Sequence, residues 1–363
     1  MRAGLGLSRI RDFFDQAGSA LCRGIGLLVV CALAATSVAE AAPRGRSSTS
    51  ASAESAGGVK TFMGASYLDL KGWAAKYGLT ATWVEAGRRM KLSSDYTTLV
   101  LEADQRDLMI NGLRVYLGEP MVASAGTLWL GTVDARDLLG PLLRPAGVAG
   151  SIPRLKVICL DPGHGGNDTG TQNKALKLDE KRLTLDVAQR VKTQLEAKGY
   201  KVLMTRTTDK YVELEDRADY ANRARADLFI SIHFNAFAQV SVNGTETYIL
   251  TRRGQRSSSS SKREPTDNIG LPGHAADPWN ALLGYAMHRQ LVGKLQSFDR
   301  GMKFARFKVL TLLNCPGVLL ESGYLTNDAE GRKIATPAYR AEIAASIVAG
   351  VDSYAAQLKR ADG

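Results

Sequence analysis

The clearest pattern in the chain is an alternation of short apolar runs with helix-like segments from residue 155 onward. Short apolar runs bounded by turn residues indicate buried strands, and apolar residues recurring every fourth position indicate amphipathic helices. This alternation predicts an α/β fold, with a largely parallel sheet and helices on both faces. We expect strands at Lys156–Leu160, Tyr200–Met204, Asp227–Ile232, Thr245–Leu250, Phe307–Leu310 and Val318–Leu320, and helices at Asp179–Lys198, Leu214–Ala224, Asn280–Gln296 and Pro337–Ala356.

Residues 60–145 follow a different pattern of short β-like runs. Asn111-Gly112 is a turn signal between two of these runs. The region contains no histidine and no glycine-rich phosphate loop. Its hairpins resemble the small β-rich stalk domains related to the N-terminal domain of copper amine oxidases, which implies an accessory or wall-targeting role rather than catalysis. We expect strands at Asp95–Glu102, Arg106–Ile110, Leu113–Leu117 and Thr127–Gly131, and a short helix within Ser66–Tyr77.

Three segments lie outside these two regions. Residues 1–42 contain arginines, an apolar run at Ile25–Ala35 and the small-x-small sequence Ala39-Glu40-Ala41. This order predicts a cleaved secretory signal peptide; the alternative is an uncleaved anchor, for which the apolar run is short. Residues 43–59 are rich in Ser, Ala and Gly and predict a flexible linker. Residues 146–154 predict a hinge between the β-rich region and the α/β region.

Residues 252–277 interrupt the alternation with the serine run Ser257–Ser261 and a charged stretch. The segment is too polar for the core, so we expect a surface loop over the strand ends, or a lid. It lies between His233 and Glu321 in the sequence. We therefore also advance the hypothesis that it covers the site until a protein activator moves it. After removal of the signal peptide, no segment is long and apolar enough to predict an integral membrane span.

Charge and cysteine content narrow the choice of partners. The net charge is +11, which on an exported protein suggests an anionic envelope polymer or a membrane surface as a neighbour. The basic residues are scattered and not interleaved with aromatic ones, which argues against nucleic-acid binding. Cys159 and Cys315 remain after signal cleavage, and two cysteines do not make a disulfide framework. We expect them to be small apolar residues, with a bridge in an oxidising compartment as the alternative.

Ionisable side chains stand at the ends of three predicted strands. His164 follows Asp161-Pro162 and a glycine. His233 comes directly after the apolar run Leu228–Ile232, and Glu321 comes directly after Val318–Leu320. Sites in open α/β sheets form at the carboxyl ends of the strands. Two imidazoles and a carboxylate gathered there predict a metal site with hydrolytic chemistry.

A fourth ionisable group, Glu180, begins a predicted helix. It lies three residues before Leu183 and seven before Val187, so it shares the inward apolar stripe. A carboxylate buried there is costly unless it is paired or binds a metal. The alternative is that Glu180 has no functional role and only reflects the preference of glutamate for the first turn of a helix, where the helix dipole favours it. Spacing alone leaves these two interpretations open.

Taken together, the motifs from about residue 155 to 358 resemble the zinc-dependent N-acetylmuramoyl-L-alanine amidases that carry an amidase-3 catalytic domain. The resemblance implies one zinc ion held by His164, Glu180 and His233, with Glu321 as the catalytic residue. It also implies peptidoglycan as substrate and cleavage between the muramic acid lactyl group and L-alanine. The motifs are Val157-Ile-Cys-Leu-Asp-Pro-Gly-His-Gly-Gly166, Glu180-Lys181, Thr205-Arg206, Leu214-Glu-Asp-Arg217, Ala221-Asn222, Ala226-Asp-Leu-Phe-Ile-Ser-Ile-His-Phe-Asn-Ala236, Asp299-Arg-Gly-Met-Lys303 and Leu320-Glu-Ser-Gly-Tyr-Leu-Thr-Asn327.

Neighbouring residues receive secondary roles. Asp161 either orients His164 or caps the turn before Pro162. Asn235 either contacts substrate or braces the loop after His233. Arg206 and Arg217 either bind a stem-peptide carboxylate or make structural ion pairs.

We predict no role at the site for the two remaining histidines. We expect His274 to be exposed in the polar loop, although it could approach the metal in a closed state. We expect His288 to be a packing or surface residue on its helix.

Two other functions remain open. A zinc peptidase acting within the stem peptides would use the same residues. A wall-binding protein with an inactive amidase-like domain is the non-enzymatic alternative, although the presence of all four expected residue types argues against it. In every case we expect an exported protein of the periplasm or cell envelope.

Overall fold

The computed structural model describes residues 58–148 and 150–362. Residues 57–363 form one compact unit. The predicted signal peptide and nearly all of the predicted linker lie outside the described residues. None of the helices in the described part combines the length and apolar character that a membrane-spanning segment needs.

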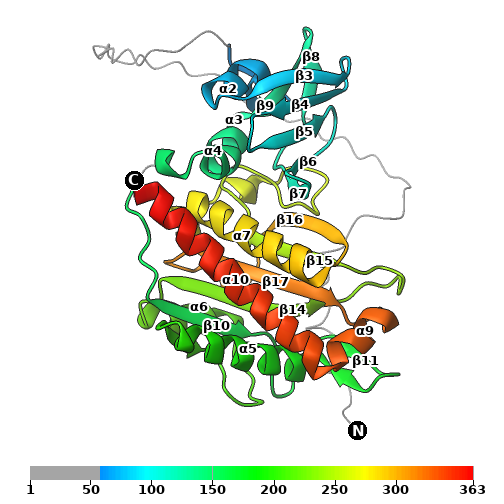
Figure 1. The fold of residues 1–363 in the computed structure, drawn as a ribbon, viewed down its shortest axis with the longest axis vertical. Coiled ribbons are helices and arrows are strands. Elements are labelled where there is room, and N and C mark those ends of the chain that lie inside the picture. Colours follow the sequence, from blue (N-terminus) through cyan, green and yellow to red (C-terminus); the bar gives the residue numbers. More distant parts are fainter. Residues whose placement is uncertain (1–57, 149, 363) are drawn as a thin grey trace, which may run out of the picture. The chain divides into compact units, whose positions relative to one another are not determined.

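The α/β region is built on six neighbouring strands in the order β13-β10-β14-β17-β15-β16 (Figure 1). The first four are mutually parallel, and β15 is antiparallel to β17 and parallel to β16. The predicted α/β class is confirmed, but the sheet is mixed rather than largely parallel throughout. The strands are β10 (Val157–Pro162), β13 (Lys201–Met204), β14 (Leu228–Asn235), β15 (Thr245–Leu250), β16 (Asp299–Ala305) and β17 (Gly317–Tyr324), with a separate two-stranded hairpin β11 (Gln172–Asn173) and β12 (Leu178–Asp179).

Strand periodicity divides the core between the two faces of this sheet. In β14, Ile230 and Ile232 join one apolar cluster, while Phe229 joins another on the opposite face. The first face is covered by α5, α7 and α10, and Figure 1 shows α10 crossing it beside α7. The second face packs under α6 and α8. These helices are α5 (Glu180–Ala197), α6 (Leu214–Arg223), α7 (Asp277–Leu295), α8 (Lys308–Thr311) and α10 (Pro337–Asp362), with α9 (Asp328–Ala335) after β17.

One strand prediction is wrong. Residues Phe307–Leu310 were expected to be a strand, but Lys308–Thr311 form helix α8, and the strand β16 ends earlier, at Ala305. The apolar Val309 and Leu310 gave the signal, because a short apolar run fits a buried strand or one helical turn equally well. Here both side chains are buried in the cluster under α6.

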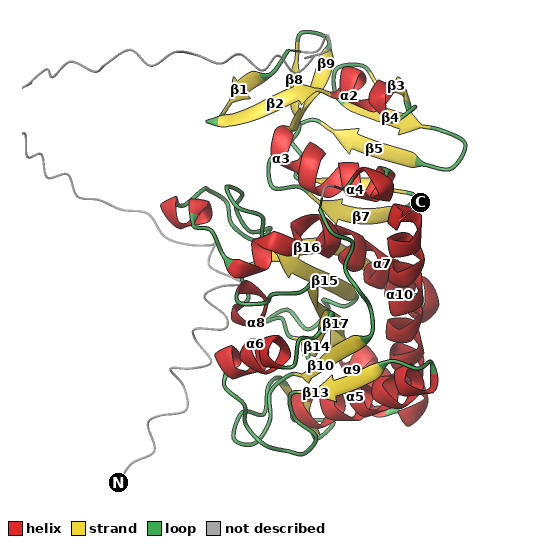
Figure 2. Cartoon of the chain, turned by 90° about the vertical axis from the view of Figure 1, so that its left-hand side faces the viewer, coloured by secondary structure: helices red, strands yellow, loops and turns green. Residues whose placement is uncertain are grey.

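The N-terminal region contains two sheets (Figure 2). Strands β3 to β7 form an antiparallel meander that extends the large sheet, because β7 lies parallel to β16 at Met302 and Val115. The second sheet has the order β1-β2-β9-β8. The division of this chain into an accessory and a catalytic domain therefore stays a proposal. The elements are β1 (Lys60–Phe62), β2 (Ala65–Asp69), α2 (Leu70–Lys76), β3 (Thr80–Glu85), β4 (Arg89–Ser93), β5 (Thr98–Glu102), β6 (Asp107–Ile110), β7 (Leu113–Tyr116), β8 (Val122–Ser124), β9 (Thr127–Gly131), α3 (Thr132–Asp134), η1 (Ala135–Leu139), α4 (Gly140–Leu143) and η2 (Pro145–Gly147).

Candidate metal centre

Three residues meet at the carboxyl ends of the parallel strands, as the sequence predicts. Ligand atoms of His164, Glu180 and His233 all lie within 4.8 Å of one another. Oε1 of Glu180 is 3.1 Å from Nε2 of His164 and 3.0 Å from Nδ1 of His233. His164 follows β10, His233 lies in β14, and Glu180 is the first residue of α5. Helix and strands thus deliver one donor each to a single point.

Glycines make room for this cluster. A Cβ at Gly163 would lie 2.2 Å from the His233 ring, and one at Gly170 would lie 2.6 Å from both Glu180 Oε2 and the His164 ring. His164 itself has φ of 62°, a left-handed conformation that is uncommon for a residue with a side chain. Backbone strain of this kind is concentrated at functional sites, where surrounding structure maintains it.

The cluster is electrostatically suited to a cation. Glu180 is 2% exposed. Burial alone would raise the pKa of Glu180, but the imidazoles of His164 and His233 outweigh it and hold the pKa well below its usual range. The main chain N–H of Thr171 also donates to Glu180 Oε2 at 2.8 Å. Two imidazoles and one buried carboxylate at this spacing could hold a divalent metal ion.

Glu321 lies beside the cluster. It pairs in register with His233 across β14 and β17, and it is 4% exposed. Its Oε2 has no hydrogen-bond partner in the part of the chain that the structure describes. Burial, followed by repulsion from Glu180 and Glu246, raises the pKa of Glu321 well above its usual range. A carboxyl group with an unused oxygen at this edge is available for proton transfer.

The residue that orients His164 is Asp168, which was not predicted. Oδ2 of Asp168 lies 2.8 Å from Nδ1 of His164, leaving Nε2 directed at Glu180. Asp161, the predicted candidate, instead accepts hydrogen bonds from Thr205, Arg217 and Ser231. The role predicted for Asp161 as the group that orients His164 therefore stays a prediction. The signal for Asp168 was its position four residues after His164, on the far side of a glycine turn.

Arg206 and Arg217 are interior residues rather than substrate-facing ones. They are 1% and 2% exposed. Arg206 donates to the carbonyls of Pro162 and Gly163, and Arg217 donates to Asp161 and the carbonyl of Pro162. Of the two roles predicted for these arginines, the contacts favour the structural one. Their guanidinium groups instead hold the turn that carries His164.

Asn235 has the bracing role. Its Nδ2 donates to Glu246 Oε2 at 3.0 Å, and its Oδ1 accepts from the main chain N–H of Ala236. Glu246 was not predicted to matter. It is 2% exposed, lies opposite Glu321 in register, and accepts further hydrogen bonds. A charged residue inside the apolar run Thr245–Leu250 was the available signal. The other donors to Glu246 are Tyr248, Arg300, Lys303 and Tyr324.

The other histidines and the cysteines lie outside the cluster. His288 is fully buried and contacts Thr247 and Asp299, so the packing interpretation is confirmed. His274 is half-buried rather than exposed, and its Nε2 contacts the carbonyl of Thr251. Cys159 and Cys315 are free and buried, and burial raises the pKa of both thiols, that of Cys315 to about 12.

The 252–277 loop lies at the opposite edge of the sheet. It follows β15, which runs antiparallel to β17, so β15 ends at the edge away from Glu321. It contacts the N-terminal region, where Arg252 bonds Asp134 and Arg263 bonds Glu119. It also contacts the end of β16, where the main chain N–H of Phe304 donates to Ser258. These contacts do not support the predicted lid over the strand ends of the site, which stays a prediction. The direction of β15 could not be predicted from its residues, and a parallel strand would have placed the loop beside the site.

The fold and the cluster define an α/β protein with two histidines and one glutamate at its strand ends that could hold a metal ion. The family model of N-acetylmuramoyl-L-alanine amidase, amidase-3, matches residues 158–353. The chain belongs to this family, and the resemblance seen in the sequence is confirmed.

Several curated relatives carry the same name. The chain is 35% identical over 221 residues to N-acetylmuramoyl-L-alanine amidase AmiC of Neisseria meningitidis serogroup B, covering 55% of this chain and 53% of that protein. It is 33% identical over 219 residues to AmiC of Escherichia coli O6:H1, covering 54% and 52%. The chain thus spans about half the length of these curated relatives. A solved N-acetylmuramoyl-L-alanine amidase from Clostridium difficile 630 is 32% identical, with a TM-score of 0.46, over 56% of this chain and 97% of that one.

Proposed function

We propose that this protein is a zinc-dependent N-acetylmuramoyl-L-alanine amidase that hydrolyses the amide between the muramic acid lactyl group and L-alanine in peptidoglycan. One observation carries the proposal: Glu321 stands in register opposite His233, at the edge where His164 and Glu180 converge. Family membership supports the same chemistry. The predicted signal peptide supports action in the periplasm or cell envelope, in wall remodelling or daughter-cell separation.

The residues have distinct roles in this proposal. His164, Glu180 and His233 hold one zinc ion, which when bound lowers the pKa of water and polarises a carbonyl. Glu321 takes a proton from the attacking water and returns it to the departing amine nitrogen.

Support from surrounding residues is indirect. Asp168 fixes the ring of His164 through Nδ1. Arg206 and Arg217 fix the backbone on either side of that histidine through carbonyl contacts at Pro162, Gly163 and His164. Asn235 and Glu246 hold the strand end that carries His233. None of these roles requires contact with substrate.

The test is incubation of purified, zinc-loaded protein with peptidoglycan, followed by mass spectrometry of the products. Free stem peptides that begin with L-alanine, with intact lactyl groups, are expected. Glu321→Ala should release none, whereas Glu342→Gln, which alters an exposed glutamate on α10, should match the unchanged protein.

Other products would redirect the assignment. Cuts within the stem peptide would favour a zinc peptidase. Binding to peptidoglycan without any cut by zinc-loaded protein would favour a wall-binding module. An activator that acts on the 252–277 loop stays a proposal, although the contacts of that loop with Asp134 and Glu119 do not support a cover over the site.

A further inference from the structure

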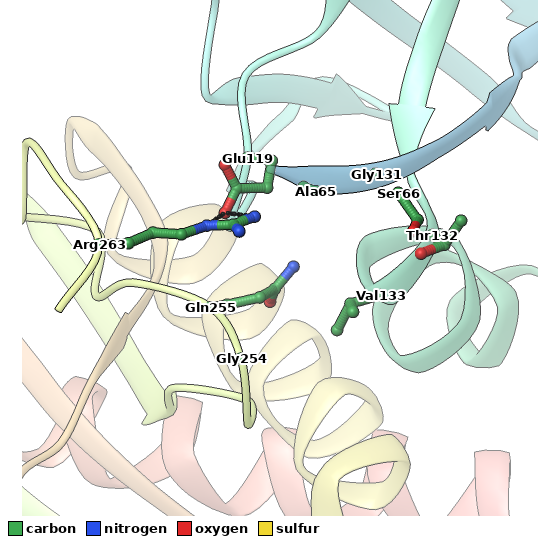
Figure 3. A pocket seen from close by; sticks show the side chains of 9 residues that line it. All are labelled: Ala65, Ser66, Glu119, Gly131, Thr132, Val133, Gly254, Gln255 and Arg263. Carbon is green, nitrogen blue, oxygen red and sulfur yellow. Dashed lines mark hydrogen bonds and ion pairs between the residues drawn. The ribbon is translucent and has the colours of Figure 1, made fainter. Parts of the chain in front are cut away.

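A cavity of about 160 Å³ lies between the N-terminal region and the 252–277 loop (Figure 3). Figure 3 shows the carboxamide of Gln255 facing Ser66 and Thr132, with the Glu119–Arg263 ion pair at one end. This site is at the sheet edge away from Glu321. Its residues play no part in the proposed hydrolysis. The lining consists of Ala65, Ser66, Glu119, Gly131, Thr132, Val133, Gly254, Gln255 and Arg263.

Gln255 presents an unused donor to this cavity. The residue is 2% exposed, and its Nε2 has no hydrogen-bond partner among the described residues. Its Oε1 is already engaged, accepting from Arg252 Nε at 2.8 Å. The carboxamide also packs against Gly118, where a Cβ would lie 2.2 Å from its carbon. A buried amide N–H without an acceptor is costly, so a fixed donor aimed into a cavity indicates a ligand oxygen.

Positive charge is in excess among the residues next to this cavity, although Arg263 is the one arginine among its lining residues. We define the seam cluster as four arginines, two carboxylates and Gln255. Arg252 pairs with Asp134 at 2.8 Å, and Arg263 pairs with Glu119 at 2.8 Å. The other two arginines have no carboxylate partner among the described ion pairs. The members of the seam cluster are Arg106, Glu119, Asp134, Arg252, Gln255, Arg256 and Arg263.

The two unpaired arginines are bonded to neutral groups. Arg106 donates to the carbonyls of Gly118, Ser257 and Ser260, and Arg256 donates to the carbonyl of Ser261. Burial, followed by repulsion from Arg256, lowers the pKa of Arg106 to about 10. Two guanidinium groups thus stand close together without an ion-pair partner among the described residues, and the nearby carboxylates of Glu119 and Asp134 offset the charge of Arg106 only in part. Nη1 of Arg252 also lacks a partner in the described structure.

The lining sets the chemistry of the ligand. Arg263 contacts Oε1 of Glu119 through both Nε and Nη2, so the second carboxylate oxygen is left to accept from a ligand. Gln255 and the hydroxyl groups of Ser66 and Thr132 supply donors. A carboxylate next to an N–H group would satisfy both kinds of partner. A phosphate dianion would bring a second negative charge towards Glu119, which a single carboxylate does not.

We propose that this cavity binds a small carboxylate with an adjacent N–H donor, the chemistry of a free amino acid or of a peptide C-terminus. Neutralisation of the excess guanidinium charge and the unused Gln255 donor both favour the carboxylate. The choice of wall-derived probes below rests on the proposed function, but the cavity argument does not. Binding is read without turnover, so failure of the hydrolysis assay leaves this test intact.

The test is isothermal titration calorimetry of the purified protein with D-alanine, D-alanyl-D-alanine, acetate and phosphate. D-Alanine or the dipeptide is expected to bind with a dissociation constant of about 1 mM or tighter. Tighter binding of one of them identifies a free amino acid or a peptide end as the source. Acetate as tight as D-alanine, phosphate alone, or no binding by any probe would overturn the proposal.

The location is tested with Gln255→Glu. This change keeps the acceptor for Arg252, replaces the unused donor with an acceptor and adds a negative charge. Binding should weaken at least tenfold, while the free protein becomes more stable to heat because the guanidinium excess falls. Lys262→Gln, which makes the same change in net charge at a largely exposed side chain, should bind normally.

A second variant covers the case in which Gln255→Glu does not fold. Thr132→Val removes a lining hydroxyl group and keeps the side-chain shape, and it should weaken binding a few-fold. Undiminished carboxylate affinity in a folded Gln255→Glu or Thr132→Val protein would place the ligand elsewhere, including at the metal centre, and would overturn the assignment.

Discussion

The two edges of the large sheet bury charge of opposite sign. At the carboxyl ends of the parallel strands, Glu180 and Glu321 are almost fully buried beside two imidazoles. At the other edge, the seam cluster places four guanidinium groups around two carboxylates. Buried charge is costly unless it is offset nearby. The first edge therefore suits a cation and the second an anion.

The two edges also differ in how the charges are held. At the metal centre, the ligands come from secondary structure: the end of β10, the strand β14 and the first turn of α5. In the seam, the arginines bond largely to carbonyls of the loop, as Arg106 does to Ser257 and Ser260. A reaction centre needs its side chains held within tenths of an ångström of their working positions. An anion site can instead be held by loop carbonyls and an excess of positive charge.

The largest expected effect separates chemistry from metal binding at the first edge. Glu321→Gln removes the proton acceptor while keeping the shape of the side chain, so the rate of hydrolysis should fall about 10²–10⁴-fold. Zinc content should not change, because the three metal-binding residues remain. Product release assays and metal analysis on the same preparation check both. Equal activity, or loss of zinc, would contradict the role given to Glu321.

The next effect tests charge pairing in the seam. Arg252→Met leaves Asp134 buried and unpaired, which should lower the free energy of unfolding by about 3–5 kcal/mol. Adding Asp134→Asn to that variant should restore part of the loss. Arg253→Met, at the exposed neighbouring position, serves as the control. Chemical denaturation measures all three, and a loss no greater than the control's would mean that the pair is not important for stability.

A smaller effect distinguishes the two aspartates near His164. Asp168→Asn weakens the partner that orients the imidazole, so zinc affinity should fall about 10- to 100-fold. Asp161→Asn should instead lower stability, because Asp161 pairs with buried Arg217. Asp219→Asn on the exposed side of α6 is the matched control. Chelator competition gives the affinities. Equal zinc affinity in Asp168→Asn and the control would contradict the role of Asp168 in orienting His164.

Local patterns were sufficient to predict that His164 and His233 lie together at the strand ends, whereas they left the role of Glu180 open and only the family resemblance indicated it as a ligand. Each of His164, Glu180 and His233 stands at a strand end or helix start, and parallel strands bring those ends to one edge whatever the rest of the fold does. Local patterns did not predict which aspartate contacts the ring of His164. It depends on the left-handed turn at His164, which returns the chain so that Asp168 faces the ring.

Strand direction and contacts between residues distant in the chain could not be predicted from the sequence. The direction of β15 decided that the 252–277 loop lies away from the site, and nothing in Thr245–Leu250 encodes that direction. The seam cluster joins residues more than a hundred positions apart, such as Asp134 and Arg252. Periodicity reports which face of an element is buried, but it does not report which distant element covers it.

The smallest effect is a pH dependence at the second edge. Burial, its largest cause, raises the pKa of Asp277 to about 7, although Arg252 opposes the shift. The unfolded value is about 3.9. Between these values the folded protein binds more protons than the unfolded chain, so stability falls as pH rises from about 4 to 7.

Asp277→Asn removes this titration. It should therefore add about 1–2 kcal/mol to the free energy of unfolding at pH 8 and almost nothing at pH 4, after allowance for the lost helix-dipole contact in the first turn of α7. Urea unfolding at pH 4, 6 and 8 checks the slope. Asp352→Asn changes a half-exposed aspartate paired with Lys198 and should show no such dependence. A parallel pH profile in Asp277→Asn and the unchanged protein would mean that Asp277 is ionised in the folded state, and that a positive excess extends from the seam cluster to the start of α7.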